Sequence, residues 1–318
     1  MSQTSKSPKA VAAAAYRTSC DTLPEHFSRY SPKKFTLPQL MVCLILKAFF
    51  NTDYRGIVQI LNDCPSLGQA FGLQTIPHFT TLQKASRRLL AADNAQALLR
   101  RTVEWGLGRR KTVLLAALDS TGLEARHISR YFVLRRRAKQ LQTLEETTYK
   151  RFPKLSVVCD CRTHLILSVI PTRGPSVDVN QFRRPLDRAV RHVSIRHLLA
   201  DAGYDSEANH RYAREIHHIL TLIPARAGRP TRKLPKTKYR RLMATDFDKK
   251  TYGQRAQVET VFSMIKRNFT DSLSARNYWS QCRDMVLLVL THNLAIILFV
   301  NELFYRAFLT PFLSQEVD

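Results

Sequence analysis

The sequence predicts an α/β domain with a mixed five-stranded sheet, preceded by an all-α region. Apolar residues recur at helical spacing from Leu37 to Ala92, which indicates several short helices. After the basic stretch 108–112, short apolar runs typical of buried strands replace this period. Two of these runs can pair as a hairpin, and the strands that follow alternate with helices. We therefore expect a helical region at 1–110 and an α/β domain at 111–318.

The first region is expected to hold several helices. Residues 1–20 are rich in serine, alanine and lysine, and we expect them to be frayed. The stretch Leu37–Phe50 predicts an apolar helix with Pro38 in its first turn, where a missing N–H costs nothing. Asp53 is a candidate N-cap for the next helix. A last helix at 75–90 has a polar start and a basic end. This pattern fits a helix-turn-helix reader of DNA and an ordinary helical bundle equally well.

Short apolar runs predict the strands of the second region. The run Val113–Ser120 holds an acid, Asp119, near its end. Two strands flank Asp160–Thr163 and form the hairpin. A helix at 177–193 then leads to another short apolar strand, which also ends in an acid, Asp201.

The remaining segments complete the expected domain. A helix capped by Ser206 precedes a last short strand at 220–226. The segment Arg226–Arg241 is strongly basic and is interrupted by glycine and proline, so we expect a loop. It opens a short basic insertion that ends at residue 251. One helix is expected over Tyr252–Phe269, and an apolar C-terminal helix over Met285–Val300.

The charge of the chain indicates a nucleic-acid partner. Lysine and arginine total 50 against 25 acids, which gives a formal net charge of +25. The excess runs through the predicted folded body and stops before the C-terminal segment, so it is not a charged tail. Charge spread in this way favours a long polyanion over a membrane patch. The alternative is that the positive charge only keeps the protein soluble. No glycine-rich phosphate loop is present, so we expect no nucleotide cofactor.

Cysteine usage and hydropathy indicate a cytoplasmic protein without a membrane span. The N-terminal stretch lacks the apolar core of a signal peptide. Met285–Val300 is short for a membrane span and has polar residues at its centre, so we expect a buried core helix. The cysteines lack the spacing of a disulfide framework and are expected to be reduced; they are Cys20, Cys43, Cys64, Cys159, Cys161 and Cys282.

Three acids follow the predicted elements in an order that suggests a metal centre. Asp119 and Asp201 lie at the ends of strands, where sites of open α/β sheets gather. Glu259 lies on the basic helix that follows. Carboxylate oxygens are the ligands that Mg²⁺ or Mn²⁺ prefers, and two such ions support in-line phosphoryl displacement. The alternative is structural: Glu259 pairs with Arg255, and each aspartate caps a helix.

A helical stripe surrounds the third acid. On one continuous helix, Tyr252, Arg255, Glu259 and Lys266 fall within about 60° of one another. This places Glu259 at the border of the buried face and away from the solvent side. The surrounding cations would neutralise a DNA backbone while the acids hold the metal ions.

Other polar signals are weaker. Residues 159–164 contain two cysteines and a histidine, but they lack the paired spacing of a zinc site. Asp178 and Asp205 lie near the acid motifs and are interpreted as caps or turns. The stretch Arg130–Lys139 combines basic and aromatic residues, and it is either a solvated face or a track for a DNA backbone.

These motifs together resemble one family. The chain resembles the DDE transposases of bacterial insertion sequences, in the broad IS-four/IS-five grouping. The spacing Tyr-(2)-Arg-(3)-Glu-(6)-Lys is complete from Tyr252 to Lys266, and "LDSTG" and "ADAGYDS" look like the first and second acid motifs. The resemblance covers roughly Asp53 to Leu294. It implies an RNase H-like fold, two Mg²⁺ or Mn²⁺ ions, cleavage at transposon ends and strand transfer into target DNA.

The resemblance also implies roles for individual residues. Asp119, Asp201 and Glu259 would be the catalytic metal ligands. Region 1–110 would bind DNA, the active complex would be a homodimer, and the protein would associate with the nucleoid. Some family members carry a large β-domain before the glutamate, which is missing here, so the functions of that β-domain are not assumed. The expected DNA contacts are Tyr252, Arg255, Lys266, Arg232, Lys233, Arg240 and Arg241.

Two other functions remain open on the sequence. The first is a structure-specific nuclease of the same fold that cleaves DNA without strand transfer. The second is a domesticated DNA-binding protein that has lost catalysis.

Overall fold

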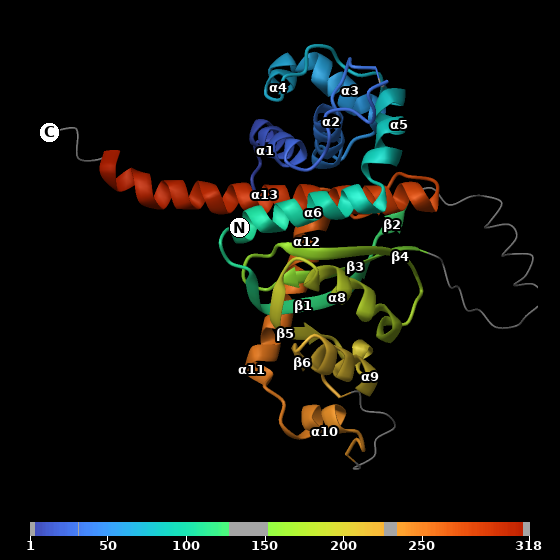
Figure 1. Cartoon of the computed structure of the whole chain (residues 1–318), viewed down its shortest axis with the longest axis vertical. Helices are drawn as coiled ribbons and strands as arrows, with labels where there is room; N and C mark the ends of the chain where they lie inside the picture. The colour runs from blue at the N-terminus through green and yellow to red at the C-terminus, as the bar shows by residue number, and fades with distance from the viewer. Residues whose placement is uncertain (1–3, 31, 127–151, 226–233, 314–318) are drawn as a thin grey trace, which may run out of the picture.

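The computed structural model of the chain describes residues 4–30, 32–126, 152–225 and 234–313, with side chains as far as Val300. A group of helices lies at one end of the molecule, a pair of long helices crosses its middle, and a sheet with smaller helices forms the other end (Figure 1). The expected division into a region 1–110 and a domain 111–318 stays a prediction, although residues 110 and 111 do lie between the last N-terminal helix and the first strand.

The N-terminal helices form where the local signals predict them. Helix α2 begins after a capping box, in which Thr36 and Gln39 exchange side-chain and backbone hydrogen bonds, and Pro38 lies in its first turn. The Asp53 carboxylate accepts hydrogen bonds from the first backbone N–H groups of α3. Both expected helix starts are therefore confirmed. The helices are α1 (Pro8–Cys20), α2 (Leu37–Phe49), α3 (Tyr54–Asp63), α4 (Pro65–Gln69), α5 (Phe79–Leu89) and α6 (Ala92–Leu107).

The expectation that residues 1–20 are frayed is wrong for the described residues 4–20. Helix α1 begins at a Ser7 cap and has Val11 and Ala12 completely buried. It packs against α2 and against the C-terminal helix. Alanine loses no side-chain entropy when it is buried, and its small size lets helices approach closely, so a weakly apolar segment becomes ordered once partners cover it.

A five-stranded mixed sheet is confirmed, with the order β4-β3-β1-β5-β6. Strand β1 pairs antiparallel with β3 and parallel with β5, so it lies at the centre. The hairpin β3–β4 forms one edge, and the parallel pair β5–β6 forms the other. The strands are β1 (Thr112–Gly122), β3 (Phe152–Asp160), β4 (Ile166–Gly174), β5 (Ser194–Ala200) and β6 (Leu220–Leu222).

Short helices and a second small sheet accompany the five-stranded sheet. Helix α8 packs against β3 and β4. The Ser206 side chain caps α9, as expected. A two-stranded parallel sheet joins β2 to β7. These elements are β2 (Glu124–Ala125), η1 (Asp178–Gln181), α8 (Arg183–Val190), η2 (Ala202–Tyr204), α9 (Glu207–Arg211), η3 (Tyr212–Ile216) and β7 (Ser272–Leu273).

Two expectations about the basic C-terminal half need correction. The segment Arg226–Arg241 was expected to be a loop, but its described part runs into a helix, α10 (Lys238–Thr245). The predicted single helix from Tyr252 is interrupted. Helix α11 (Lys249–Tyr252) is followed by a 3₁₀ turn, η4 (Gly253–Arg255), and then by α12 (Ala256–Asn268). The helical period of the sequence does not reveal this short change of winding.

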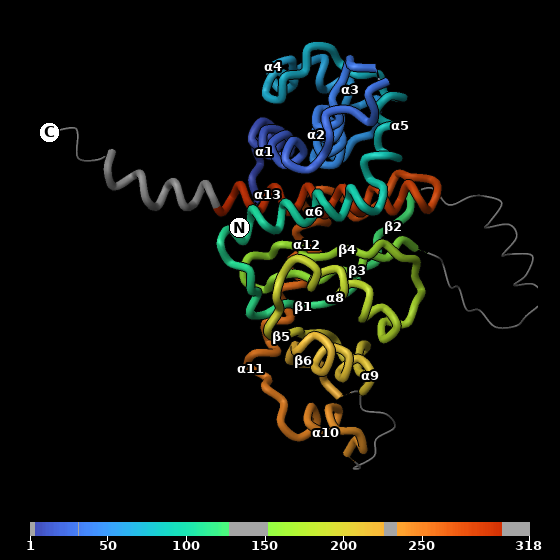
Figure 2. The backbone as a smooth tube through the Cα atoms, viewed as in Figure 1, coloured from blue at the N-terminus to red at the C-terminus, as the bar shows by residue number. Residues whose placement is uncertain are grey.

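The long helix α13 (Tyr278–Leu313) joins the two halves of the molecule. It packs against α1, α2 and α6 on one side and against β3 and β4 on the other, and Figure 2 shows its path beside α6. Among the described residues it is the one helix that is long and apolar enough to cross a membrane, but 67% of that stretch is buried inside the protein.

Polar residues in the middle of α13 hold it to the sheet. Thr291, His292 and Asn293 are completely buried. The Asn293 side chain accepts from the Ile166 N–H at 2.9 Å and donates to the carbonyl oxygen of the same residue at 2.9 Å. Because these bonds fix the start of β4, the helix serves as a core element, as expected.

Candidate active site

The register of the central strands brings the first two acids to the same place. Strands β1 and β5 run parallel, with Leu118 paired to Ala200. Asp119 and Asp201 each come one residue after this pair, Asp119 in the last third of β1 and Asp201 directly after β5. The negative charge of Asp201 contributes to the raised pKa of Asp119, so the two carboxylates lie within electrostatic reach.

Burial makes Asp119 an unusual carboxyl group. Desolvation is the largest influence and raises its pKa to about 6, with further upward contributions from Asp201 and Asp178. The Ser120 N–H donates to Asp119 Oδ1 at 2.7 Å and, with Arg255, opposes this rise. Near neutral pH the group therefore holds a negative charge that its surroundings only partly compensate.

Arg255 connects the third acid to the first. Its Nη1 donates to Asp119 Oδ2 at 3.3 Å, and its Nη2 donates to Glu259 Oε1 at 2.7 Å. One guanidinium group thus lies between a carboxylate of β1 and a carboxylate of α12. The space between these acids accommodates a cation, and the acids give that cation two partners.

The purely structural alternative for the acids does not account for these contacts. The Arg255–Glu259 pair exists, but the same guanidinium also reaches Asp119. Asp119 lies within a strand and caps no helix. Asp201 precedes η2, and its side chain makes no capping hydrogen bond. The two aspartates are therefore held near the carboxyl ends of β1 and β5 without the capping role that would have explained them.

Tyr252 belongs to this cluster, although the helix break changes how it arrives there. Its ring packs against Phe247, with centroids 4.9 Å apart, and the Arg255 guanidinium lies 6.0 Å from the ring centroid. Burial raises the pKa of its hydroxyl, and Asp201 and Asp119 add to the rise. The 3₁₀ turn, and not a shared helical stripe, places Tyr252 beside the acids.

Glu259 and Lys266 are placed differently from the expectation. The Glu259 side chain is 59% exposed, so the prediction that it avoids the solvent side is wrong. It sits at the rim of the apolar face of α12. Lys266 lies about two turns further along α12 and is half-buried. It forms no ion pair within the described part of the chain.

A fourth acid, Asp178, enters the same region. Its Oδ1 accepts from Ser120 Oγ at 3.1 Å and from the buried Lys154 ammonium at 2.5 Å. A Cβ atom on Gly203 would meet Asp178 Oδ2 at 3.5 Å. Asp178 therefore lies between the residues that follow Asp119 and those that follow Asp201. The interpretation of Asp178 as a cap or turn missed this position. The one signal in the sequence was that Asp178 follows the second hairpin strand closely along the chain.

The other basic residues that were predicted to contact DNA fall into three groups. The Arg240 guanidinium pairs with the buried Asp205 carboxylate, with Nη2 and Oδ2 2.9 Å apart, so it already has a structural role. Asp205 caps the end of η2, as expected of a cap or turn residue, and its carboxylate also faces His210 at 3.6 Å. Arg241 is exposed. Arg232, Lys233 and the stretch Arg130–Lys139 lie outside the described residues.

The donor set suits a hard divalent cation, although the acids are not drawn together around one point. Asp119, Asp201 and Glu259 offer carboxylate oxygens of the kind that Mg²⁺ and Mn²⁺ prefer. Across the described ranges, no three histidine, cysteine or acidic side chains are arranged closely enough to ligate one ion. The Arg255 guanidinium lies between two of the acids and shows that positive charge is favoured there. The three acids therefore suit Mg²⁺ or Mn²⁺ by the chemistry of their oxygen atoms and by their charge.

Comparison with known proteins supports the resemblance found in the motifs. A family model described as a transposase DDE domain matches residues 113–294, which is more than half of the 318 residues. No curated protein matches the chain. The matched span begins in β1, ends in α13 and contains all three motif acids. The mixed five-stranded sheet with its flanking helices and N-terminal helical region agrees with the RNase H-like fold of such enzymes, and the chain belongs to the transposase DDE domain family.

Proposed function

We propose that this protein cleaves DNA at the ends of an insertion sequence and joins the freed ends to target DNA. The observation that carries this proposal is that Arg255 contacts both Asp119 and Glu259, while Asp201 lies within electrostatic reach of Asp119. The net charge of +25 supports a DNA partner. The assignment of this protein to the IS-four/IS-five grouping of insertion sequences rests on the motif spacing alone.

In this proposal the three acids hold Mg²⁺ or Mn²⁺, two ions in the active complex. Bound there, the ions would activate the attacking oxygen and neutralise charge on the phosphate. Asp119 would do this best above its pKa of about 6, where its carboxylate is ionised. Asp201 and Glu259 are exposed, so ions and a DNA strand can approach them from solvent.

The cationic residues bind and orient the DNA strand. Arg255 can grip a phosphate with two N–H groups, and it already occupies a position between the acids. Tyr252 lies beside it and offers a hydroxyl group. Lys266, further along α12, would contact the backbone away from the cut as a point charge.

The reaction needs no covalent enzyme intermediate. Water attacks a phosphodiester at the end of the element and releases a 3′-hydroxyl group. That hydroxyl group then attacks a phosphodiester of the target and displaces one of its 3′-oxygens. Each step breaks one P–O bond and forms another, so the same site performs both.

Further contacts and assembly belong to the same proposal. The helices of region 1–110 would bind the element ends, and Arg232, Lys233 and Arg241 would extend the contact. Arg240 would join them only if it left Asp205. A homodimer would hold the two ends together, and the protein would act in the cytoplasm in association with the nucleoid.

The test combines purified protein, Mg²⁺, a DNA fragment with the element end and a target plasmid. Joined products are expected and would support a transposase. Cleavage without joining would identify a nuclease, and binding without cleavage would identify a non-catalytic DNA-binding protein. The end sequence comes from the DNA that flanks the gene, where inverted repeats are expected.

A further inference from the structure

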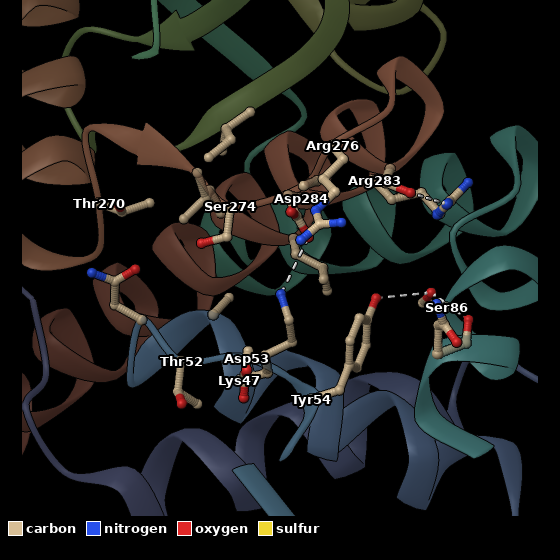
Figure 3. A pocket seen from close by; sticks show the side chains of 18 of the residues that line it. Lys47, Thr52, Asp53, Tyr54, Ser86, Thr270, Ser274, Arg276, Arg283 and Asp284 are labelled. Atoms are coloured by element: carbon tan, nitrogen blue, oxygen red, sulfur yellow. Dashed lines mark hydrogen bonds and ion pairs between the residues drawn. The ribbon is translucent and has the colours of Figure 1, made fainter. Parts of the chain in front are cut away.

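A pocket with several charged side chains lies away from the three acids, between the N-terminal helices and the segment that follows α12. Its volume is about 310 Å³. Helices α2, α3 and α5 form one wall, and residues 270–288 form the other. In Figure 3, Lys47 and Tyr54 extend from the first wall, and Arg276, Arg283 and Asp284 face them from the second. Such a space is large enough for a nucleotide unit.

The charges around the pocket leave an excess of cations. Four basic and two acidic side chains line it. Both acids already have partners within the protein. Asp53 accepts from the first backbone N–H groups of α3, and Asp284 pairs with Lys47 at 3.2 Å. Positive charge from the three arginines is therefore left without an anion.

These three arginines are available to a ligand. The exposed side chains of Arg87 and Arg276 form neither ion pairs nor hydrogen bonds with the residues that the structure describes. Arg283 donates through Nη2 to Ser280 Oγ at 2.8 Å, while its Nε is buried without a hydrogen-bond partner. A buried N–H group that lacks an acceptor is costly, and an anionic oxygen in the pocket would supply one.

The pocket lies within reach of a strand that passes through the active site. Asp119 is five residues before Glu124, which corresponds to at most about 18 Å of extended chain. Glu124 pairs with Ser272 in the small sheet, and Ser272 lines the pocket. Adjacent strands add about 5 Å, so the distance from Asp119 to Ser272 at the edge of the pocket corresponds to no more than about seven nucleotides of one DNA strand.

We propose that this pocket binds a backbone phosphate of a DNA strand that extends from the active site, through Arg87, Arg276 and Arg283. The proposal rests on the proposed DNA substrate and adds a second anchoring point to it. Contact with both walls would couple the N-terminal helices to the catalytic half. A DNA phosphodiester and a free nucleotide share this chemistry, and the experiment separates them.

The first experiment compares salt dependence. The full-length Arg87→Ala/Arg276→Ala variant is matched with Arg191→Ala/Arg196→Ala, which removes the same charge from exposed arginines at the amino end of β5. DNA affinity is measured by fluorescence anisotropy over a series of NaCl concentrations. For the pocket variant we expect a loss of about tenfold in affinity, and a slope of log affinity against log salt that is less steep by about 0.9. The control is expected to keep the wild-type slope.

A second experiment reports on the pocket itself. Ser274→Cys places a thiol at an exposed position of the pocket wall, and Ser194→Cys places one at the far end of β5. Maleimide labelling of each peptide is followed by mass spectrometry with duplex DNA, with deoxyadenosine monophosphate or with inorganic phosphate. We expect DNA alone to protect the pocket thiol, and the β5 thiol to react equally in all cases.

The outcomes distinguish this proposal from the function on which it rests. Equal protection by phosphate or the mononucleotide would identify a small-anion site and overturn the DNA assignment. Equal slopes for the pocket and control variants, in a protein that still cleaves element ends, would overturn the pocket alone. If the wild-type protein failed to bind DNA at all, the proposed function would fail with it.

Discussion

The carboxylates at the strand ends and the polar residues in the middle of α13 are both held against the same sheet, but their surroundings differ. Thr291, His292 and Asn293 are completely buried, and burial lowers the pKa of His292 to about 4, so this group is neutral near pH 7. Asn293 has its hydrogen bonds satisfied by the backbone of β4. This buried cluster is neutral and closed to solvent.

The acid cluster has the opposite character. Glu259 is 59% exposed, and Asp119 keeps a pKa of about 6 although Arg255 contacts it. The negative charge of the acid cluster is therefore only partly compensated by the described residues. Neutral, mostly hydrogen-bonded polar groups hold α13 to the sheet, with His292 Nδ1 as the one atom of this cluster that is buried without a partner among the described residues. Charges that are open to solvent and only partly compensated are instead typical of a ligand site.

The largest expected effect is the loss of DNA cleavage when a residue of the acid cluster is changed. Asp119→Asn, Asp201→Asn and Glu259→Gln should each lower Mg²⁺-dependent cleavage by at least about a thousandfold, because each change removes a ligand charge with little change of shape. DNA binding should remain. Cleavage and anisotropy assays measure both quantities.

Glu215→Gln is the matched control for these variants. Glu215 is also a half-exposed acid that pairs with an arginine four residues away on a helix, but it lies outside the cluster. Its variant should cleave normally. Near wild-type cleavage by any of the three cluster variants would remove that residue from the ligand set.

The second prediction concerns stability. Asn293→Ala should lower the free energy of unfolding by about 2–5 kcal/mol, because it leaves the Ile166 N–H and carbonyl groups buried without partners. Chemical denaturation measures this. Thr291→Val is the control, because its hydroxyl group only reaches the carbonyl group of Leu287 on the same helix. If both variants lowered the free energy of unfolding equally, the hydrogen bonds between Asn293 and Ile166 would not make the expected additional contribution to stability.

The third prediction uses pH. The folded-state pKa of Asp119 is raised from 3.8 to about 6, so its stabilising contribution is complete below pH 3.8 and is lost as pH rises through 6. Well above pH 6, Asp119→Asn should therefore be more stable than the wild type by about 3 kcal/mol, and below pH 4 the two should be equal. Denaturation in EDTA measures the difference. A variant that is less stable at pH 8 would show that the carboxylate stabilises the fold.

The smallest expected effect concerns Arg255. Arg255→Lys keeps the charge but cannot reach Asp119 and Glu259 together with two N–H groups, so cleavage should fall by about tenfold. Lys266→Arg should be milder. If Arg255 only paired with Glu259 along the helix, the pair would contribute about 0.2–0.5 kcal/mol and the variant would cleave normally. Cleavage rates and melting temperatures distinguish the two accounts.

Much of the acid cluster was predictable because its signals are local or depend on a simple sheet rule. An apolar run that ends in an acid predicts a strand that delivers Asp119 or Asp201 to the end of a sheet. Parallel pairing then brings these ends together, as the register confirms. Glu259 could be added through the spacing of its motif. The contact between Arg255 and Asp119 could not, because it joins two elements that are far apart along the chain.

The residues that sequence reasoning misplaced share one property. Asp178 reaches the acids because η1 packs against η2, and Arg240 is directed to Asp205 because α10 packs against α9. Neither packing has a periodic signal. The pocket likewise depends on helices of the first region that meet residues 270–288.

The sequence by itself determined the elements whose causes lie within a few residues: the caps at Thr36, Asp53 and Ser206, the strands, and the order of the acids. Hydrogen bonds between near neighbours and side-chain periodicity suffice for these features. Only the tertiary structure decided that α1 is ordered, that Glu259 faces solvent, and that α13 holds both halves together. These outcomes depend on which surfaces cover one another, and that is a property of the whole packed chain.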